Sequence, residues 1–179
     1  MIGNDIVDLQ LAGIQSNWQR RGWLQKIFTL LEQKEIYNSS SPNLQVWKFW
    51  SMKEAAYKAH QRCFHHAPTF NPKKIECVSA TSVCIEKYVY ELATEFTKEY
   101  VYSIARSTGA YYYSEIFQAE INPREELKKL IRSSITKKDR LYFKKDINGI
   151  PNLYINGKCS KIPFSLTHHG DYSAYVMLS

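Results

Sequence analysis

Residues 44–61 read LQVWKFWSMKEAAYKAHQ and contain neither glycine nor proline. Apolar side chains recur along one side of this segment at the spacing of an α-helix: Val46, Phe49, Ala56 and Ala59. Trp50, Glu54 and Lys58 follow one another at four-residue intervals on a second stripe. The segment therefore predicts a long helix that packs one side on a core and carries an acid and a base one turn apart. A Glu–Lys pair at this spacing is most often part of a solvated helix face.

The N-terminal segment, Ile2 to Leu9, is short and apolar and is interrupted by Asn4, Asp5 and Asp8. As a strand it would point Asp5 to the same side as Val7, because successive side chains alternate between the two faces. A carboxylate near the end of a buried strand either coordinates a cation or caps a neighbouring turn. By itself the pattern favours capping.

Helices are expected mainly before strands along the rest of the chain. Trp18 to Ile27 has helical spacing, and Thr29-Leu-Leu-Glu32 is a capping box that predicts a helix start. Strands are predicted over four segments rich in β-branched and aromatic residues: Lys74 to Ala80, Val83 to Leu92, Tyr100 to Ala105 and Tyr111 to Ile121. A helix is expected over Pro123 to Ile135, and two strands joined by a turn over Phe164 to Leu178. This order is typical of an α+β fold.

The composition restricts the class of protein. A chain of 179 residues with 44% hydrophobic and 23% charged residues has ordinary globular composition, and we expect one domain over residues 1–179. No apolar run approaches the roughly 18 residues that a membrane helix needs, and the first residues do not read as a secretory signal. The four cysteines show no CxxC spacing, which argues against a structural zinc site and favours reduced thiols in a cytoplasmic protein.

The net charge of +7 favours an anionic partner, which could be nucleic acid, a phosphorylated small molecule or an acidic protein. Much of the excess lies in residues 128–145, where mainly Asp139 opposes it. A basic nucleic-acid-binding domain would use this segment, but no recognised nucleic-acid motif accompanies it, so nucleic acid is not the expected partner. A solvated basic surface accounts for the charge equally well.

Near the C-terminus, Ser165-Leu-Thr-His168-His-Gly-Asp171 gathers side chains that occur in nucleophile and metal sites. Adjacent histidines in a turn point in different directions, and a zinc ion would lack obvious further ligands. A catalytic serine would need Ser165, His168 and Asp171 together, and no G-x-S-x-G turn is present to support it. Each cluster alone is a weak indication of function.

Together and in this order, the clusters resemble the 4′-phosphopantetheinyl transferase superfamily, and within it the smaller branch, the holo-acyl-carrier-protein synthases. The matching residues are Gly3, Asp5, Ile6, Val7 and Asp8; Phe28, Thr29 and Glu32; Phe49-Trp50 with Lys53, Glu54, Ala55, Lys58 and Ala59; Phe70-Asn-Pro72; and Gly149-Ile-Pro151 before Ser165-Leu-Thr-His168. The block around Glu54 is the most specific. The resemblance implies this family's α+β fold, an antiparallel sheet packed against helices, with extra strands in the middle segment.

The family transfers 4′-phosphopantetheine from coenzyme A to a serine of an apo acyl or peptidyl carrier protein and releases 3′,5′-ADP. The resemblance therefore implies a catalytic set of Asp5, Glu54 and Lys58, with Mg²⁺ bound by Asp5 and Glu54. Magnesium suits such a site because it prefers carboxylate, phosphate and water oxygens. Glu54, directly or through a metal-bound water, would be the base toward the carrier serine.

Further residues are implied to bind coenzyme A. Lys53, Lys58, Ser165 and His168 are expected around its phosphates, and Arg20 and Arg21 are assigned to the adenosine phosphate or to the acidic carrier helix. In the small branch one subunit supplies the two carboxylates and a neighbour supplies the terminal Ser/His strand. The chain holds one set of each, so the resemblance predicts a homo-oligomer, with a trimer favoured.

Two departures from the family pattern matter. Val7 stands where the larger branch has a third carboxylate, so water would fill that position around the ion. Residues 60–66 replace the glycine-rich turn that usually follows the long helix. A non-catalytic member that binds coenzyme A or a carrier protein is therefore the alternative function.

Overall fold

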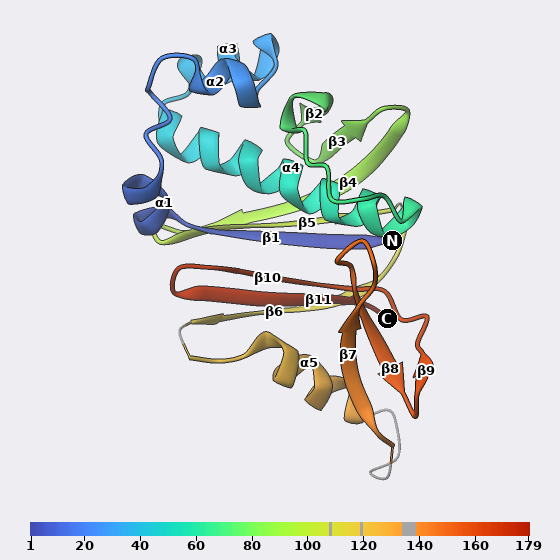
Figure 1. The fold of residues 1–179 in the computed structure, drawn as a ribbon. Coiled ribbons are helices and arrows are strands. Elements are labelled where there is room, and N and C mark those ends of the chain that lie inside the picture. Colours follow the sequence, from blue (N-terminus) through green and yellow to red (C-terminus); the bar gives the residue numbers. More distant parts are fainter. Residues whose placement is uncertain (108, 119, 134–138) are drawn as a thin grey trace.

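The computed structural model describes residues 1–107, 109–118, 120–133 and 139–179, and it folds into two parts that lie one above the other (Figure 1). The upper part contains an antiparallel five-stranded sheet in the order β1-β5-β4-β3-β2. Its strands are β1 (Ile2–Asp8), β2 (Ile75–Ser79), β3 (Ser82–Ile85), β4 (Tyr88–Phe96) and β5 (Tyr100–Arg106). Its helices are α1 (Leu9–Gln15), α2 (Trp23–Ile27), α3 (Leu30–Asn38) and α4 (Pro42–Phe64).

The lower part is built around a three-stranded antiparallel sheet in the order β10-β11-β6. These strands are β6 (Tyr112–Gln118), β10 (Phe164–His169) and β11 (Tyr172–Leu178). Helix α5 (Pro123–Arg132) and a small sheet of β7 (Leu141–Lys145), β8 (Pro151–Ile155) and β9 (Lys158–Cys159) complete this part. Leu127 of α5, Leu153 of β8 and Phe164 of β10 meet in its core.

Helix α4 lies along the upper sheet and crosses directly over β1 (Figure 1). Its start suits Pro42, since the first helical residue needs no backbone donor. Gly3 lets the two elements touch, because a Cβ built at this position would lie 2.3 Å from the carbonyl oxygen of Ala55 and 2.5 Å from the amide nitrogen of Ala59. The close approach places the α4 stripe of Glu54 and Lys58 beside the β1 side chains that face the helix.

The two parts meet where β10 lies along β1. Strand β1 pairs with β5 on one edge, and on the other edge its backbone N–H groups donate to side chains of β10. The N–H of Asn4 donates to Ser165 Oγ at 3.3 Å and that of Ile6 to Thr167 Oγ1 at 3.3 Å. Because residues two apart share a face of a strand, one face of β10 satisfies one edge of β1.

An apolar cluster closes the same junction on the other side of β1. Ile2 and Ile6 pack there with Tyr102 and Ile104 of β5 and with Ala174 and Val176 of β11. Odd-numbered residues of β1 therefore face α4, as Val7 does in the upper core, and even-numbered residues face the lower sheet. This alternation confirms the prediction that Asp5 and Val7 share a side.

The structure differs from the sequence-based expectations in three places. Trp18 to Ile27 is helical only over α2, while a short helix, α1, was not predicted and begins where Asp8 accepts the Leu11 N–H. The single strand predicted over Val83 to Leu92 is two strands, because Glu86 takes a left-handed backbone conformation with φ 56° and turns the chain.

The third difference concerns α5, which ends at Arg132 rather than Ile135. Residues 134–138, which include Ile135 and two lysines of the predicted basic segment, lie outside the described residues. No helix in the described part of the chain has the length and apolar character needed to cross a membrane.

Candidate active site

Asp5 lines a hollow of about 440 Å³ between β1, α4 and β10. Its side chain is nearly buried, and its Oδ1 accepts hydrogen bonds from Lys58 Nζ at 3.0 Å and from Thr167 Oγ1 at 3.3 Å. Its Oδ2 is buried and has no hydrogen-bond partner among the residues that the structure describes. One carboxylate oxygen is therefore held by the protein and the other is left for a ligand.

Glu54 and Lys58 line the same hollow from α4, one turn apart. Burial, and to a lesser extent the negative charge of Asp5, raise the pKa of Glu54 to about 7, while Lys58 opposes the shift. Lys58 Nζ also donates to the carbonyl of Asn4 at 3.0 Å, which fixes the ammonium between helix and strand. The hollow thus holds two carboxylates close enough to repel and one ammonium that offsets part of their charge.

Strand β10 contributes Thr167, His168 and His169 to the hollow. Thr167 touches Asp5 directly, and Lys58 Nζ lies 3.4 Å from its hydroxyl oxygen. His168 is exposed at the rim. His169 accepts the Asp8 N–H at Nδ1, 2.9 Å away, and its Nε2 lies 3.3 Å from Gln15 of α1.

These contacts are made within one chain. The expectation that a neighbouring subunit supplies the terminal strand is therefore wrong, because β10 of the same chain lies against Asp5 and Lys58. The physical reason is the long edge contact between β1 and β10, in which three backbone N–H groups of β1 find acceptors on β10.

A sequence model of the 4′-phosphopantetheinyl transferase superfamily matches residues 1–115, which carry Asp5, Glu54 and Lys58. The chain belongs to this superfamily. The resemblance seen in the sequence is confirmed, and so is the expected α+β fold of the family.

The solved structures that are similar to the chain include the Thermotoga maritima holo-[acyl-carrier-protein] synthase, with a TM-score of 0.44 and 11% sequence identity, covering 84% of this chain and 80% of that chain. A comparison with curated protein sequences gives no match.

Within this family member, the two carboxylates fit a magnesium ion. Magnesium is usually bound by one or two carboxylates together with substrate phosphates and water. Asp5 offers a buried, unpartnered Oδ2, and Glu54 lines the same hollow. Within the described ranges, no three His, Cys, Asp or Glu side chains are arranged so that they could hold one metal ion together, so phosphate and water oxygens would complete the coordination.

Lys53 does not line the hollow, although the family motif led us to expect it at the coenzyme. Its side chain is fully buried, and its Nζ lies 2.7 Å from Glu32 Oε2. The same ammonium donates to the carbonyls of Ile27, Pro72 and Ile75. One residue along an α-helix turns the side chain by about 100°, so Lys53 points into the core while Glu54 reaches the hollow.

Ser165 also makes its hydrogen bond within the fold. It is buried and accepts the Asn4 N–H, and it does not line the hollow. Ser165 and His168 were both expected to bind coenzyme A, but residues three apart on a strand lie on opposite faces. Thr167 and His169 were not predicted, because the family motif marks Ser165 and His168. The signal that identifies them is the alternation of Ser165, Thr167 and His169 along one face of the strand.

Arg20 and Arg21 are exposed in the turn before α2 and do not line the hollow. The neighbouring hollow over Trp18 and Trp47 shares Ser16 and Trp47 with the site but does not include the two arginines either. Of the predicted site residues, the structure brings together Asp5, Glu54, Lys58 and His168.

Proposed function

We propose that the protein transfers 4′-phosphopantetheine from coenzyme A to a serine of an apo acyl or peptidyl carrier protein, in a magnesium-dependent reaction that releases 3′,5′-ADP. The observation that carries the proposal is the hollow in which Asp5, Glu54, Lys58 and His168 meet in a member of the transferase superfamily. We propose further that the enzyme is of the holo-acyl-carrier-protein synthase type, because the order of its sequence motifs resembles that branch.

The residues of the hollow divide the reaction between them. The carrier serine oxygen forms a bond to the phosphorus next to the pantetheine arm, and the bond from that phosphorus to the bridging oxygen breaks. The departing 3′,5′-ADP keeps the bridging oxygen, and Glu54 takes the serine proton. In the metal-free protein the pKa of Glu54 is raised to about 7, so this carboxylate can take up a proton near neutral pH.

Lys58 is positioned to neutralise the diphosphate, since its Nζ is held between Asn4 and Asp5 at the edge of the hollow. Asp5 and Glu54 would hold Mg²⁺, which when bound neutralises phosphate charge and orients the leaving group. Thr167 holds Asp5 through its hydroxyl and so keeps the free Oδ2 turned to the ligand.

The macromolecular partner is expected to be acidic. A net charge of +7 attracts an acidic carrier protein and a polyanionic coenzyme by the same long-range field. Because the described residues of one chain line the hollow, a monomer is sufficient for the proposed reaction. A trimer stays a prediction from the family resemblance. The interlocked edge of β1 and β10 supports a single functional domain over residues 1–179.

The proposal is tested by mass spectrometry of a panel of apo carrier proteins incubated with coenzyme A, Mg²⁺ and enzyme. The wild-type protein adds the phosphopantetheine mass to at least one carrier, while Glu54→Gln and Asp5→Asn do not. Glu35→Gln, which changes an exposed acid on α3, is the matched control and retains activity.

Calorimetry separates the alternative function. Binding of coenzyme A without mass addition to any carrier would show a non-catalytic binding member of the family and would refute the transferase.

A further inference from the structure

Three side chains that alternate along β10 accept the backbone N–H groups on the free edge of β1. In order along the strand they are Ser165, Thr167 and His169. A hydroxyl oxygen can accept at any pH at which the protein is folded, whereas an imidazole nitrogen stops accepting when it is protonated. Of these three acceptors only His169 titrates, and it lies at the end of the row next to α1.

The hydrogen bonds of His169 indicate which form of the ring the fold requires. Nδ1 accepts the Asp8 N–H at 2.9 Å, so this nitrogen carries no proton. The proton of the neutral ring is then assigned to Nε2, which donates to Gln15 Oε1 at 3.3 Å. A second proton on Nδ1 would place a donor against the Asp8 N–H and break the contact. The neutral imidazole is therefore the form that makes both hydrogen bonds.

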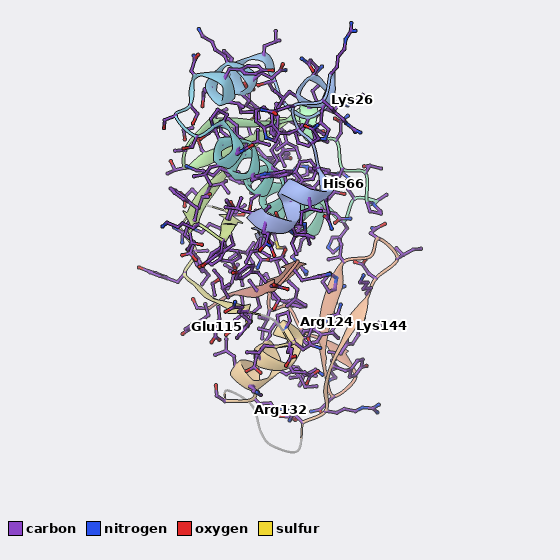
Figure 2. All side chains as sticks on the ribbon, turned by 90° about the vertical axis from the view of Figure 1, so that its left-hand side faces the viewer. Lys26, His66, Glu115, Arg124, Arg132 and Lys144 are labelled. Carbon is purple, nitrogen blue, oxygen red and sulfur yellow. The ribbon has the colours of Figure 1, made fainter. Side chains whose placement is uncertain are left out.

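Asp8 joins the same end of β1 to α1 and to the turn between β10 and β11. Its Oδ1 accepts the Leu11 N–H at 3.0 Å, and its Oδ2 accepts the Asp171 N–H at 3.1 Å. Helix α1 and the β10–β11 turn lie at the same end of the molecule in Figure 1, and Figure 2 looks onto that end. We call the contacts among Asp8, Gln15 and His169 the clasp, because they tie β1, α1 and β10 together.

The clasp supports one wall of the candidate active site. Gln15 and Ser16, at the end of α1, line the hollow together with His169. Helix α1 has seven residues, of which Ala12 is buried, and an isolated helix this short is not stable in water. The position of the wall therefore depends on the contacts that α1 makes at the clasp.

We propose that neutral His169 is a positioning residue for the transfer reaction, which holds the α1 wall against β10, and that its protonation releases the wall and weakens the binding of coenzyme A. The inference rests on the proposed function, which makes coenzyme A the ligand of the hollow. A wall that is in place for only part of the time raises the apparent dissociation constant and leaves the bound state unchanged. We therefore expect the effect in KM rather than in kcat.

The charges around His169 do not replace the clasp when the ring is protonated. Asp8 attracts an imidazolium, but the atom of Asp8 that faces Nδ1 is its backbone N–H. Helix α1 carries no charged side chain. The titratable and charged groups on the other elements around His169 are Asp5 and Asp8 of β1, Glu54 and Lys58 of α4, Glu99 before β5, His168 of β10, and Asp171 with Tyr172 at the start of β11.

The experiment compares wild type, His169→Asn and His169→Phe at about pH 7.5 and about pH 5.5, the range in which histidine changes its charge. Asparagine places its Oδ1 where imidazole has Nδ1 and does not titrate, whereas phenylalanine has no acceptor. Steady-state carrier modification gives KM for coenzyme A and kcat. At pH 7.5 the asparagine variant keeps the wild-type KM, and the phenylalanine variant raises it about three- to tenfold with kcat unchanged.

Lowering the pH raises the wild-type KM by a similar factor relative to the asparagine variant. This ratio cancels the protonation of Glu54, which both proteins share. His66→Asn removes an exposed imidazole from the loop after α4 and is the control that keeps the pH dependence of the wild type. Circular dichroism establishes that each variant is folded.

NMR tests the clasp without the reaction. The nitrogen chemical shifts of the His169 ring should show the Nε2–H form at neutral pH, and amide exchange in α1 should speed up as His169 is protonated. A proton on Nδ1 at neutral pH would overturn the inference. So would the same pH dependence of KM in the wild type and His169→Asn. If the wild type modifies no carrier protein, the proposed transfer is refuted, while NMR still decides whether the clasp exists.

Discussion

Replacing Lys53 with methionine tests the assignment of this residue to the core rather than to the coenzyme site. Lys53 is fully buried, and its ammonium binds Glu32 and three backbone carbonyls. Methionine has similar length and no charge, so the substitution leaves the Glu32 carboxylate buried with only the N–H groups of Thr29 and Cys77 as partners.

The expected loss is large because the partner charge stays behind. Removing one member of a buried ion pair costs about 3–5 kcal/mol, against a total stability of about 5–15 kcal/mol for a domain. At about 2–4 °C per kcal/mol for a chain of this size, the thermal midpoint should fall by about 10 °C. Urea unfolding followed by circular dichroism measures the change in the free energy of unfolding.

The double variant Lys53→Met with Glu32→Gln sharpens the test. If the two side chains are direct partners, the double variant is destabilised by clearly less than the sum of the two single variants. Lys34→Met on the exposed side of α3 is the control and changes stability by less than about 0.5 kcal/mol.

A coenzyme A affinity measured on folded Lys53→Met should equal that of the wild type. A stability within about 1 kcal/mol of the wild type, combined with loss of coenzyme binding, would refute the reasoning and return Lys53 to the ligand site.

Three further predictions concern the contact of β1 with α4 and β10. Gly3→Ala should lower the free energy of unfolding, measured in urea, by about 1–3 kcal/mol and reduce the rate of transfer, because a methyl group there would overlap the α4 backbone. Gly13→Ala is the control and should cause neither loss, because a Cβ at that position meets nothing within 4 Å. In the metal-free protein, the pKa of Glu54 is raised from 4.5 to about 7. As the pH rises through this range, the Glu54 carboxyl loses its proton in the unfolded chain before it does so in the folded protein, so the free energy of unfolding should fall by about 3 kcal/mol. Glu54→Gln should flatten this profile in urea titrations at several pH values, and an unchanged profile would contradict the burial of the carboxyl. Thr167→Val should lower both stability and the rate of carrier modification, since it removes a contact to Asp5, whereas Ser165→Ala should lower stability alone; equal rates in the two variants would count against the separate roles.

Much of the fold could be predicted from the sequence because its signals are local. The stripes of α4 repeat within a few residues, and the capping box needs only Thr29 and Glu32, whose reciprocal hydrogen bonds the structure contains. The alternation in β1 and the turn between β10 and β11 are equally short-range. Glu54 and Lys58 could be paired for the same reason, since residues four apart on one helix keep their spacing wherever that helix packs.

Only the tertiary structure decided which residues from different segments face the same hollow and which charged side chains form an ion pair. The partner of Lys53 is Glu32, which lies 21 residues away and meets it because α3 packs on α4. The selection of Thr167 over Ser165 depends on how β10 lies against β1. Contacts between segments remote in sequence are fixed by packing, and no local pattern of residues encodes them.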